Sequence, residues 1–277
     1  MLLVPGILLS YFSGKGTSQE IPRRIISLGP ALTEGIYLLG AENNLVGCTI
    51  FCRKPQDAAR KEKVGSVVEI NVERVISLKP DLVLATSLTD RRSKEKLQKL
   101  GIRVVTFMEA KDFSELCRQF SSLGKILGKE KEADKIIDRA KKDVAAIFSR
   151  IKGHDKPKVL LELGANPLFV ATDRTFVNDF IVLSGGVNIA SGARSGLYSR
   201  EEVIRRNPDV IIIVDMGITA EKEREFWLKF KDLSAAKKNQ VYILNPDKVC
   251  SPTPLSFAET LKEISVLLHP SPPPHEK

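Results

Sequence analysis

Cysteine and histidine are scarce in this 277-residue sequence, with 4 and 3 residues respectively. The cysteines are too few for a disulfide scaffold and lack the paired CxxC spacing of a zinc site. His154, His269 and His275 fall in linker or tail positions, so a histidine-ligated metal is not predicted. The first strand-to-helix loop is not GxGxxG, and no phosphate-binding GxxxxGKS or GxxxxGKT loop occurs. We therefore expect no nucleotide cofactor, no resident metal and no catalytic residues.

Clustered charge is also missing. The 43 Lys and Arg residues outnumber the 34 Asp and Glu residues, which gives a net charge of +9, but they are spread along the chain without a basic-aromatic motif. We interpret this charge first as solvated surface and second as a field that attracts an anionic ligand, so no nucleic-acid partner is predicted. A hydrophobic content of 43% is typical of a soluble protein, and the length allows two cores.

The two ends of the chain differ from the rest. Residues 1–20 form a signal-like leader, because their apolar run has the length of a signal-peptide core and is too short to span a bilayer. No basic residue precedes the run and no A-x-A site follows it, so cleavage, anchoring and a later-than-true start codon all stay open, as does a buried N-terminal strand. Export is the expectation. The proline-rich residues 270–277 predict a disordered tail.

One stretch of the chain occurs twice, at 71–85 (NVERVISLKPDLVLA) and 199–213 (SREEVIRRNPDVIII). Each copy predicts a capped short helix that stops before a proline, followed by a strand buried on both faces. The three matched pairs lie 128 positions apart without a gap: Glu73 and Glu201, Pro80 and Pro208, and Asp81 and Asp209. A helix-turn-strand pattern could recur by chance in an α/β protein, but the matched glutamate favours two duplicated domains.

Strands and helices alternate around these repeats, which predicts an α/β fold with parallel sheets in two lobes. The N-terminal lobe covers residues 21–128 and the C-terminal lobe residues 153–269. Between them, residues 129–152 show apolar residues at helical spacing without proline, so one long, rigid helix should join the lobes. Duplicated lobes of this kind place a ligand cleft between them.

Together these segments resemble one family. RIISLGPALTEGIYLLGA, the VG...CxxP loop at 46–55 and both repeat copies are similar to the periplasmic binding proteins of ABC importers for cobalamin and iron chelates, over residues 22–268. The resemblance implies a monomer in the periplasm or exported to the cell surface, which delivers its ligand to an ABC permease and its ATPase. It also implies that Glu73 and Glu201 dock onto permease arginines. Ser199 and Glu202 predict a capping box, which leaves Glu201 free to point outward.

The resemblance implies a corrinoid ligand of the cobalamin type, with a ferric siderophore or haem as the alternative. Phe51 and Phe169 match cleft aromatics of the family, but the tryptophans often placed before the two repeats are absent. Loop cations could instead select an anionic chelate: Arg53, Lys54, Arg91, Arg92, Arg174 and Arg194. The predicted ligand-binding residues are Pro30, Phe51, Cys52, Arg53, Phe169, Arg194, Tyr198 and Cys250.

Cys52 and Cys250 lie in loops that follow strands, one in each lobe, and the duplicated plan turns both loops toward the cleft. They could form a disulfide, stay as two separate thiols, or supply a thiolate to the metal of the ligand. Cys48 and Cys117 are expected in the core.

Two other functions fit the same fold. A two-domain α/β transferase would use the same cleft, but the sequence offers no nucleotide site or catalytic base for it. A cell-surface sensor that binds the same ligand would share every sequence feature.

Overall fold

The computed structural model describes residues 20–215, 217 and 220–270. The predicted leader and tail therefore lie, except for Glu20 and Pro270, outside the described residues. In the part that is described, no helix combines the length and the apolar character needed to cross a membrane.

A parallel sheet forms the centre of the N-terminal lobe, with strand order β3-β2-β1-β4-β5. Apolar strands fill its middle, and Leu82, Val83 and Leu84 are fully buried because helices cover both faces of a parallel sheet. The elements are β1 (Ile25–Ser27), α1 (Pro30–Leu38), β2 (Leu45–Cys48), β3 (Glu62–Lys63), α2 (Val72–Ser77), β4 (Leu82–Thr86), α3 (Arg91–Lys99) and β5 (Arg103–Phe107), with short 3-10 helices η1 (Glu42–Asn44) and η2 (Gln56–Arg60).

The C-terminal lobe has a second sheet, ordered β10-β9-β6-β7, with β8 pairing β6. Its strands are parallel except β7, which runs antiparallel to β6. The elements are β6 (Lys158–Ala165), β7 (Leu168–Val170), α6 (Val177–Leu183), β8 (Val187–Asn188), α7 (Arg200–Arg206), β9 (Val210–Val214), α8 (Ala220–Leu228), α9 (Ser234–Lys237), β10 (Val241–Leu244) and α10 (Pro246–Val249).

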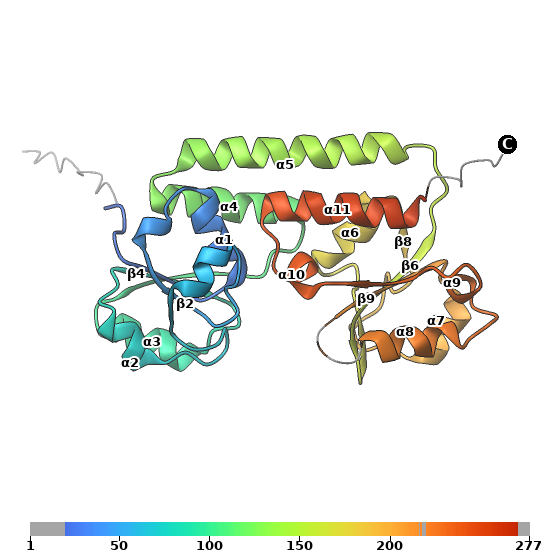
Figure 1. Ribbon diagram of the computed structural model, residues 1–277, viewed down its shortest axis with the longest axis horizontal. Coiled ribbons are helices and arrows are strands. Elements are labelled where there is room, and N and C mark those ends of the chain that lie inside the picture. Colours follow the sequence, from blue (N-terminus) through green and yellow to red (C-terminus); the bar gives the residue numbers. More distant parts are fainter. Residues whose placement is uncertain (1–19, 216, 218–219, 271–277) are drawn as a thin grey trace, which may run out of the picture.

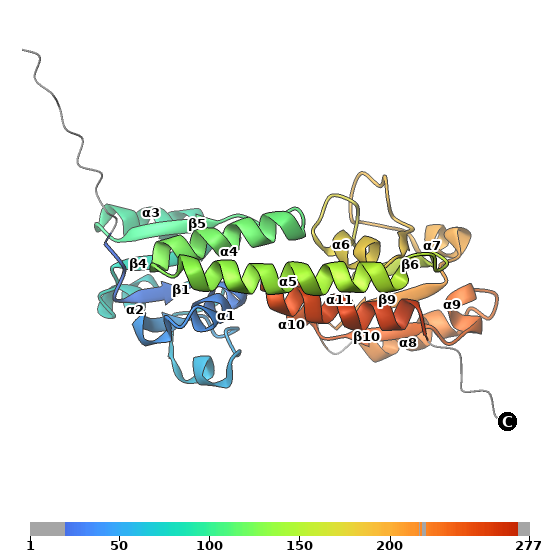
Figure 2. The same ribbon diagram turned by 90° about the horizontal axis from the view of Figure 1, so that it is seen from above.

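Three helices join the lobes: α4 (Phe113–Leu127), α5 (Glu130–Ile151) and α11 (Pro254–Leu268). Helix α5 runs along both lobes and packs against α4 and α11, which confirms the predicted linking helix (Figures 1 and 2). One continuous apolar core includes residues of both sheets and all three helices. At the junction, the ring of Phe257 stacks on Phe113 at 4.7 Å and on Phe180 at 4.3 Å between centroids. Because the core is shared, rotation of one lobe against the other would break close packing.

The duplicated stretches adopt the same local structure. Asn71 and Ser199 cap α2 and α7 by accepting hydrogen bonds from the third residue on, as predicted. The residues before the prolines, Lys79 and Asn207, both take left-handed φ values, of 47° and 49°. The two repeated aspartates also share one contact, since each accepts a backbone N–H at the start of its lobe's first strand: Asp81 from Arg23 and Arg24, and Asp209 from Lys158. The repeat therefore extends to these contacts.

Some details of the fold were not predicted. The segment 51–70 contains η2 and the edge strand β3, whose pairing with β2 uses backbone atoms that the basic sequence does not reveal. The predicted parallel sheets are confirmed, with one local exception in the second sheet, where the two-residue turn after β6 returns β7 antiparallel to it. The lobe limits of 21–128 and 153–269 stay predictions.

Candidate ligand-binding site

A cavity of about 400 Å³ lies at the carboxyl edge of the N-terminal sheet. The loops that follow β1, β2, β4 and β5 all contribute to its wall, as expected for an open parallel sheet. At the first of these loops the chain passes very close to β4, since a Cβ on Gly29 would lie only 2.7 Å from Thr86 Cγ2. Glycine at this position therefore lets Pro30, the first residue of α1, reach the cavity wall.

The wall carries large apolar side chains that are not covered by protein. Phe51 is 48% exposed, and Leu88 and Met108 are each 64% exposed. Exposed apolar side chains that line a concave site are typical of a site that binds a small molecule with apolar faces.

The C-terminal lobe closes one side of the cavity through Phe176 and the turn Cys250, Ser251 and Pro252. Phe176 packs edge-on against Phe180, at 6.4 Å between ring centroids, and so connects the cavity wall to the aromatic stack at the lobe junction. The cavity therefore lies between the lobes, as predicted.

A smaller cavity of about 100 Å³ shares Pro30, Phe51, Cys250 and Ser251 with the first one and has charged walls. Its charged residues are Glu34, Arg53, Lys54 and Asp247. Burial raises the pKa of Glu34, although Thr253 Oγ1 donates a hydrogen bond to its carboxylate at 3.2 Å. This bond links α1 to the start of α11, so the charged cavity also lies at the junction of the lobes. Across the described ranges, no group of three or more His, Cys, Asp or Glu could hold a metal ion.

The structure brings Pro30, Phe51, Arg53 and Cys250 together at these two cavities. Burial, followed by the nearby Asp247 and Glu109, raises the pKa of the Cys250 thiol to about 11. That Pro30, Phe51, Arg53 and Cys250 contact the ligand stays a prediction.

Cys52 does not reach the cavities. It is fully buried, and its Sγ lies 3.1 Å from Thr33 Oγ1 and 3.2 Å from Thr49 Oγ1. Its thiol is free, so the disulfide with Cys250 that the sequence left open is not formed. The turn that follows β2 points Cys52 into the lobe and Phe51 out of it, which the sequence alone could not indicate. Cys48 and Cys117 are buried as expected.

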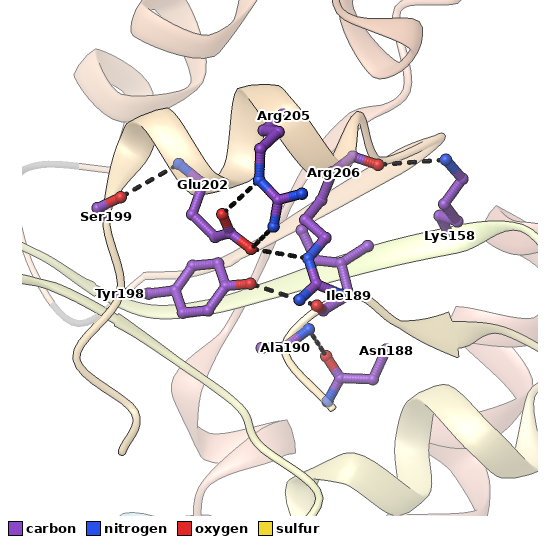
Figure 3. A network of polar contacts seen from close by, with 9 residues as sticks. All are labelled: Lys158, Asn188, Ile189, Ala190, Tyr198, Ser199, Glu202, Arg205 and Arg206. Carbon is purple, nitrogen blue, oxygen red and sulfur yellow. Dashed lines mark hydrogen bonds and ion pairs between the residues drawn. The ribbon is translucent and has the colours of Figure 1, made fainter. Parts of the chain in front are cut away.

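The remaining predicted ligand contacts lie in the C-terminal lobe and do not line either cavity. Phe169, on β7, is 43% exposed and pairs with Leu197 across an isolated bridge. Tyr198 packs against the apolar core of this lobe and donates its hydroxyl hydrogen to the Ile189 carbonyl at 3.3 Å, which gives it a structural role (Figure 3). The loop cations Arg91, Arg92, Arg174 and Arg194 likewise do not line the cavities.

Sequence reasoning missed several large apolar residues of the wall, among them Leu88, Phe107, Met108 and Phe176. Leu88 lies two residues after the end of β4, and Met108 directly follows β5, so the rule that ligands bind at the carboxyl ends of parallel strands could have found them. Phe176 carries no such signal, because its position depends on how the two lobes pack.

Glu73 and Glu201 lie in the first turns of α2 and α7, and both are exposed. Neither has an ion-pair partner among the described residues. Both helices lie on the side of the sheets opposite α5 (Figure 1). The two glutamates therefore belong to helices on the same side of the molecule, at matched places in the two lobes.

The predicted capping box at α7 is only half formed. Ser199 accepts a hydrogen bond from the Glu202 backbone N–H at 3.1 Å, but the Glu202 carboxylate pairs with Arg205 and Arg206 instead of returning to Ser199 (Figure 3). These two guanidinium groups lower the pKa of Glu202 to about 2. Glu201 is still left pointing to solvent.

Comparison with known proteins decides the family. Residues 25–248 match the family whose description is periplasmic binding protein. The chain belongs to this family. Among its relatives, an uncharacterized ABC transporter substrate-binding lipoprotein, YvrC of Bacillus subtilis, is 32% identical over 264 residues, covering 92% of this chain and 82% of that protein. A vitamin B12-binding protein of Yersinia pestis is 29% identical over 212 residues, covering 76% and 75%.

Solved structures of periplasmic binding proteins agree with this placement. A possible iron-binding, periplasmic solute-binding protein of Staphylococcus epidermidis superposes with a TM-score of 0.81 at 28% identity, covering 90% of this chain and all of that one. As a periplasmic binding protein of the ABC type, the chain works outside the cytoplasm with a permease and its ATPase, as the sequence predicted. The family consists of transport proteins that bind a solute, so the transferase alternative gains no support from it.

Proposed function

We propose that this periplasmic binding protein captures a corrinoid of the cobalamin type between its lobes and delivers it to the permease. The observation that carries the proposal is the apolar cavity with exposed Phe51, Leu88 and Met108, which suits the flat, largely apolar face of a macrocycle. The similarity to a vitamin B12-binding protein supports the same ligand class. Exposed Phe169 and Leu197 lie outside the two cavities, and they would contact a part of the ligand that extends beyond the cavities toward the C-terminal lobe.

A ferric siderophore or haem is the second candidate, and one observation favours it. Arg53 and Lys54 lie at the charged cavity next to Phe51, where they could bind carboxylates of an anionic chelate. Glu34 and Asp247 line the same cavity and offset this positive charge. We therefore rank the corrinoid first.

Calorimetric titration with cobalamin, cobinamide, haem and a panel of ferric siderophores tests the ligand class. We expect binding of a corrinoid at about 1:1 with a Kd in the micromolar range or below. Tighter binding of haem or a ferric siderophore would replace the corrinoid with the second candidate. If no compound of the panel binds, both candidate ligand classes are refuted.

Docking is proposed to use Glu73 and Glu201, because exposed carboxylates at matched places suit a symmetric basic surface on the permease. Replacing both by alanine should leave the Kd for the ligand within about twofold, since charges at the edge of a protein govern docking more than the cavity. Uptake through the reconstituted permease should be lost. The double variant Glu130→Ala, Glu132→Ala on α5 is the matched control, because it removes two exposed carboxylates from the opposite side. Equal loss of uptake in the control would contradict the assignment.

A further inference from the structure

The duplicated helices α3 and α8 differ sharply in charge. They occupy equivalent places, each following the strand that ends its repeat copy. Helix α3 carries five cations and one carboxylate, whereas α8 carries two cations and three carboxylates. A duplication by itself would leave the two helices alike in charge. Instead, the N-terminal lobe has a basic helix where the C-terminal lobe has a weakly acidic one.

The cations of α3 are available to a partner. Arg91 pairs with Glu95 at 2.6 Å, but Arg92, Lys94, Lys96 and Lys99 have no ion-pair partner in the described part of the chain. Leu97 is fully buried and holds one side of the helix against the lobe, so the polar side faces solvent. In α8, by contrast, Glu223 is buried against Arg200. The positive surface of α3 is therefore not neutralised by the protein itself.

The position of α3 indicates what this surface meets. Helix α3 packs against α2, which carries Glu73, and both lie on the side of the sheets opposite α5 (Figures 1 and 2). If Glu73 docks onto a permease, the same side of the molecule approaches the membrane in which the permease is embedded. The basic helix would then lie close to lipid headgroups.

We propose that α3 contacts anionic phospholipid headgroups, an inference that rests on the proposed docking through Glu73 and Glu201. Each cation near an anionic bilayer adds to the attraction, which decays within a Debye length of about 10 Å at 0.1 M salt. Leu100, at the end of α3, is 56% exposed and can rest on the headgroup layer. The contact holds the N-terminal lobe at the membrane and raises the local concentration of loaded protein around the permease.

Vesicle co-sedimentation tests the contact without ligand or permease, so its outcome is separate from that of the ligand titrations. The full chain is mixed with vesicles of phosphatidylcholine alone or with added phosphatidylglycerol. The α3 variant replaces Arg92, Lys94, Lys96 and Lys99 by glutamine. The matched control replaces four exposed lysines of α5 on the opposite side, namely Lys131, Lys135, Lys141 and Lys142. Circular dichroism melting verifies that both variants fold.

The wild-type protein should prefer the anionic vesicles, and added salt should weaken that preference. The α3 variant should lose at least tenfold in its partition coefficient on anionic vesicles, while the α5 variant should lose less than threefold. Equal losses in the two variants would overturn the proposal, because they would show that only the net charge of the protein matters. Equal partition of the wild type onto neutral and anionic vesicles would also overturn it.

Discussion

Glu162 gives the sharpest prediction about stability. This β6 residue is 1% exposed, and its Oε2 accepts a hydrogen bond from Trp227 Nε1 at 2.9 Å. Its other oxygen, Oε1, is buried without a hydrogen-bond partner in the described structure. Burial raises the pKa of Glu162 from its ordinary 4.5 to about 8, with the nearby Glu223 adding to the shift and Trp227 opposing it. Glu162 therefore holds a proton in the folded protein at neutral pH.

The direction of the pH dependence follows from this difference. Between about pH 4.5 and 8 the folded protein binds a proton at Glu162 that the unfolded chain has lost, so the stability from the neutral carboxyl falls as pH rises. One proton changes the free energy of unfolding by about 1.4 kcal/mol per pH unit. Because Glu162 begins to lose its proton as pH approaches 8, the wild-type protein should lose about 2.5 kcal/mol from pH 5.5 to 7.5, relative to a variant without this titration.

Glu162→Gln is that variant, because its amide does not titrate and can still accept the Trp227 hydrogen bond. Urea unfolding at pH 5.5, 6.5 and 7.5 gives the free energy of unfolding for both proteins. The variant should gain stability relative to the wild type at each step upward in pH. Glu225→Gln, on the exposed side of α8, is the control and should follow the wild type. Parallel profiles for wild type and Glu162→Gln would refute the buried, protonated carboxyl.

Two further predictions concern the cavity and the repeat. Phe51→Ala removes an exposed ring from the cavity wall and should weaken ligand binding by about tenfold in a calorimetric titration, while Phe148→Ala, 55% exposed on α5, should not. Comparable loss in both variants would exclude a specific contact. Asp81→Ala removes the acceptor of the Arg23 backbone N–H at 2.7 Å and should lower the free energy of unfolding by about 1 to 3 kcal/mol in urea titrations. No change in the midpoint would show that this repeated aspartate does not fasten β1.

Much of the fold could be predicted because local and global signals agree in it. The strands Leu82–Thr86 and Val210–Val214 follow the two capped helices as predicted, since an unbroken apolar run before polar turn residues is typical of a strand buried on both faces. The long helix from Glu130 to Ile151 likewise follows its apolar spacing.

The site was harder to predict, because its geometry depends on loops and on lobe packing. Phe51 and Cys52 are neighbours in a polar loop, and only the turn after β2 decides that the ring reaches the cavity while the thiol is buried. Tyr198 follows a loop rich in glycine and serine, and its contact with the Ile189 carbonyl depends on where that loop crosses the sheet. The edge strand β3, of two residues, is below the length at which sequence periodicity indicates a strand.

The claim that ligand binds in the cavity between the lobes is tested most directly by blocking that cavity. Ser87 is an exposed residue of the wall, so Ser87→Trp should fill the cavity without disturbing the core. Ser149→Trp, on the exposed side of α5, is the matched control. Calorimetric titration with cobalamin should give wild-type affinity for Ser149→Trp and at least a tenfold higher Kd for Ser87→Trp, with unchanged melting temperatures. Wild-type affinity in Ser87→Trp would contradict the account and place the ligand elsewhere on the protein.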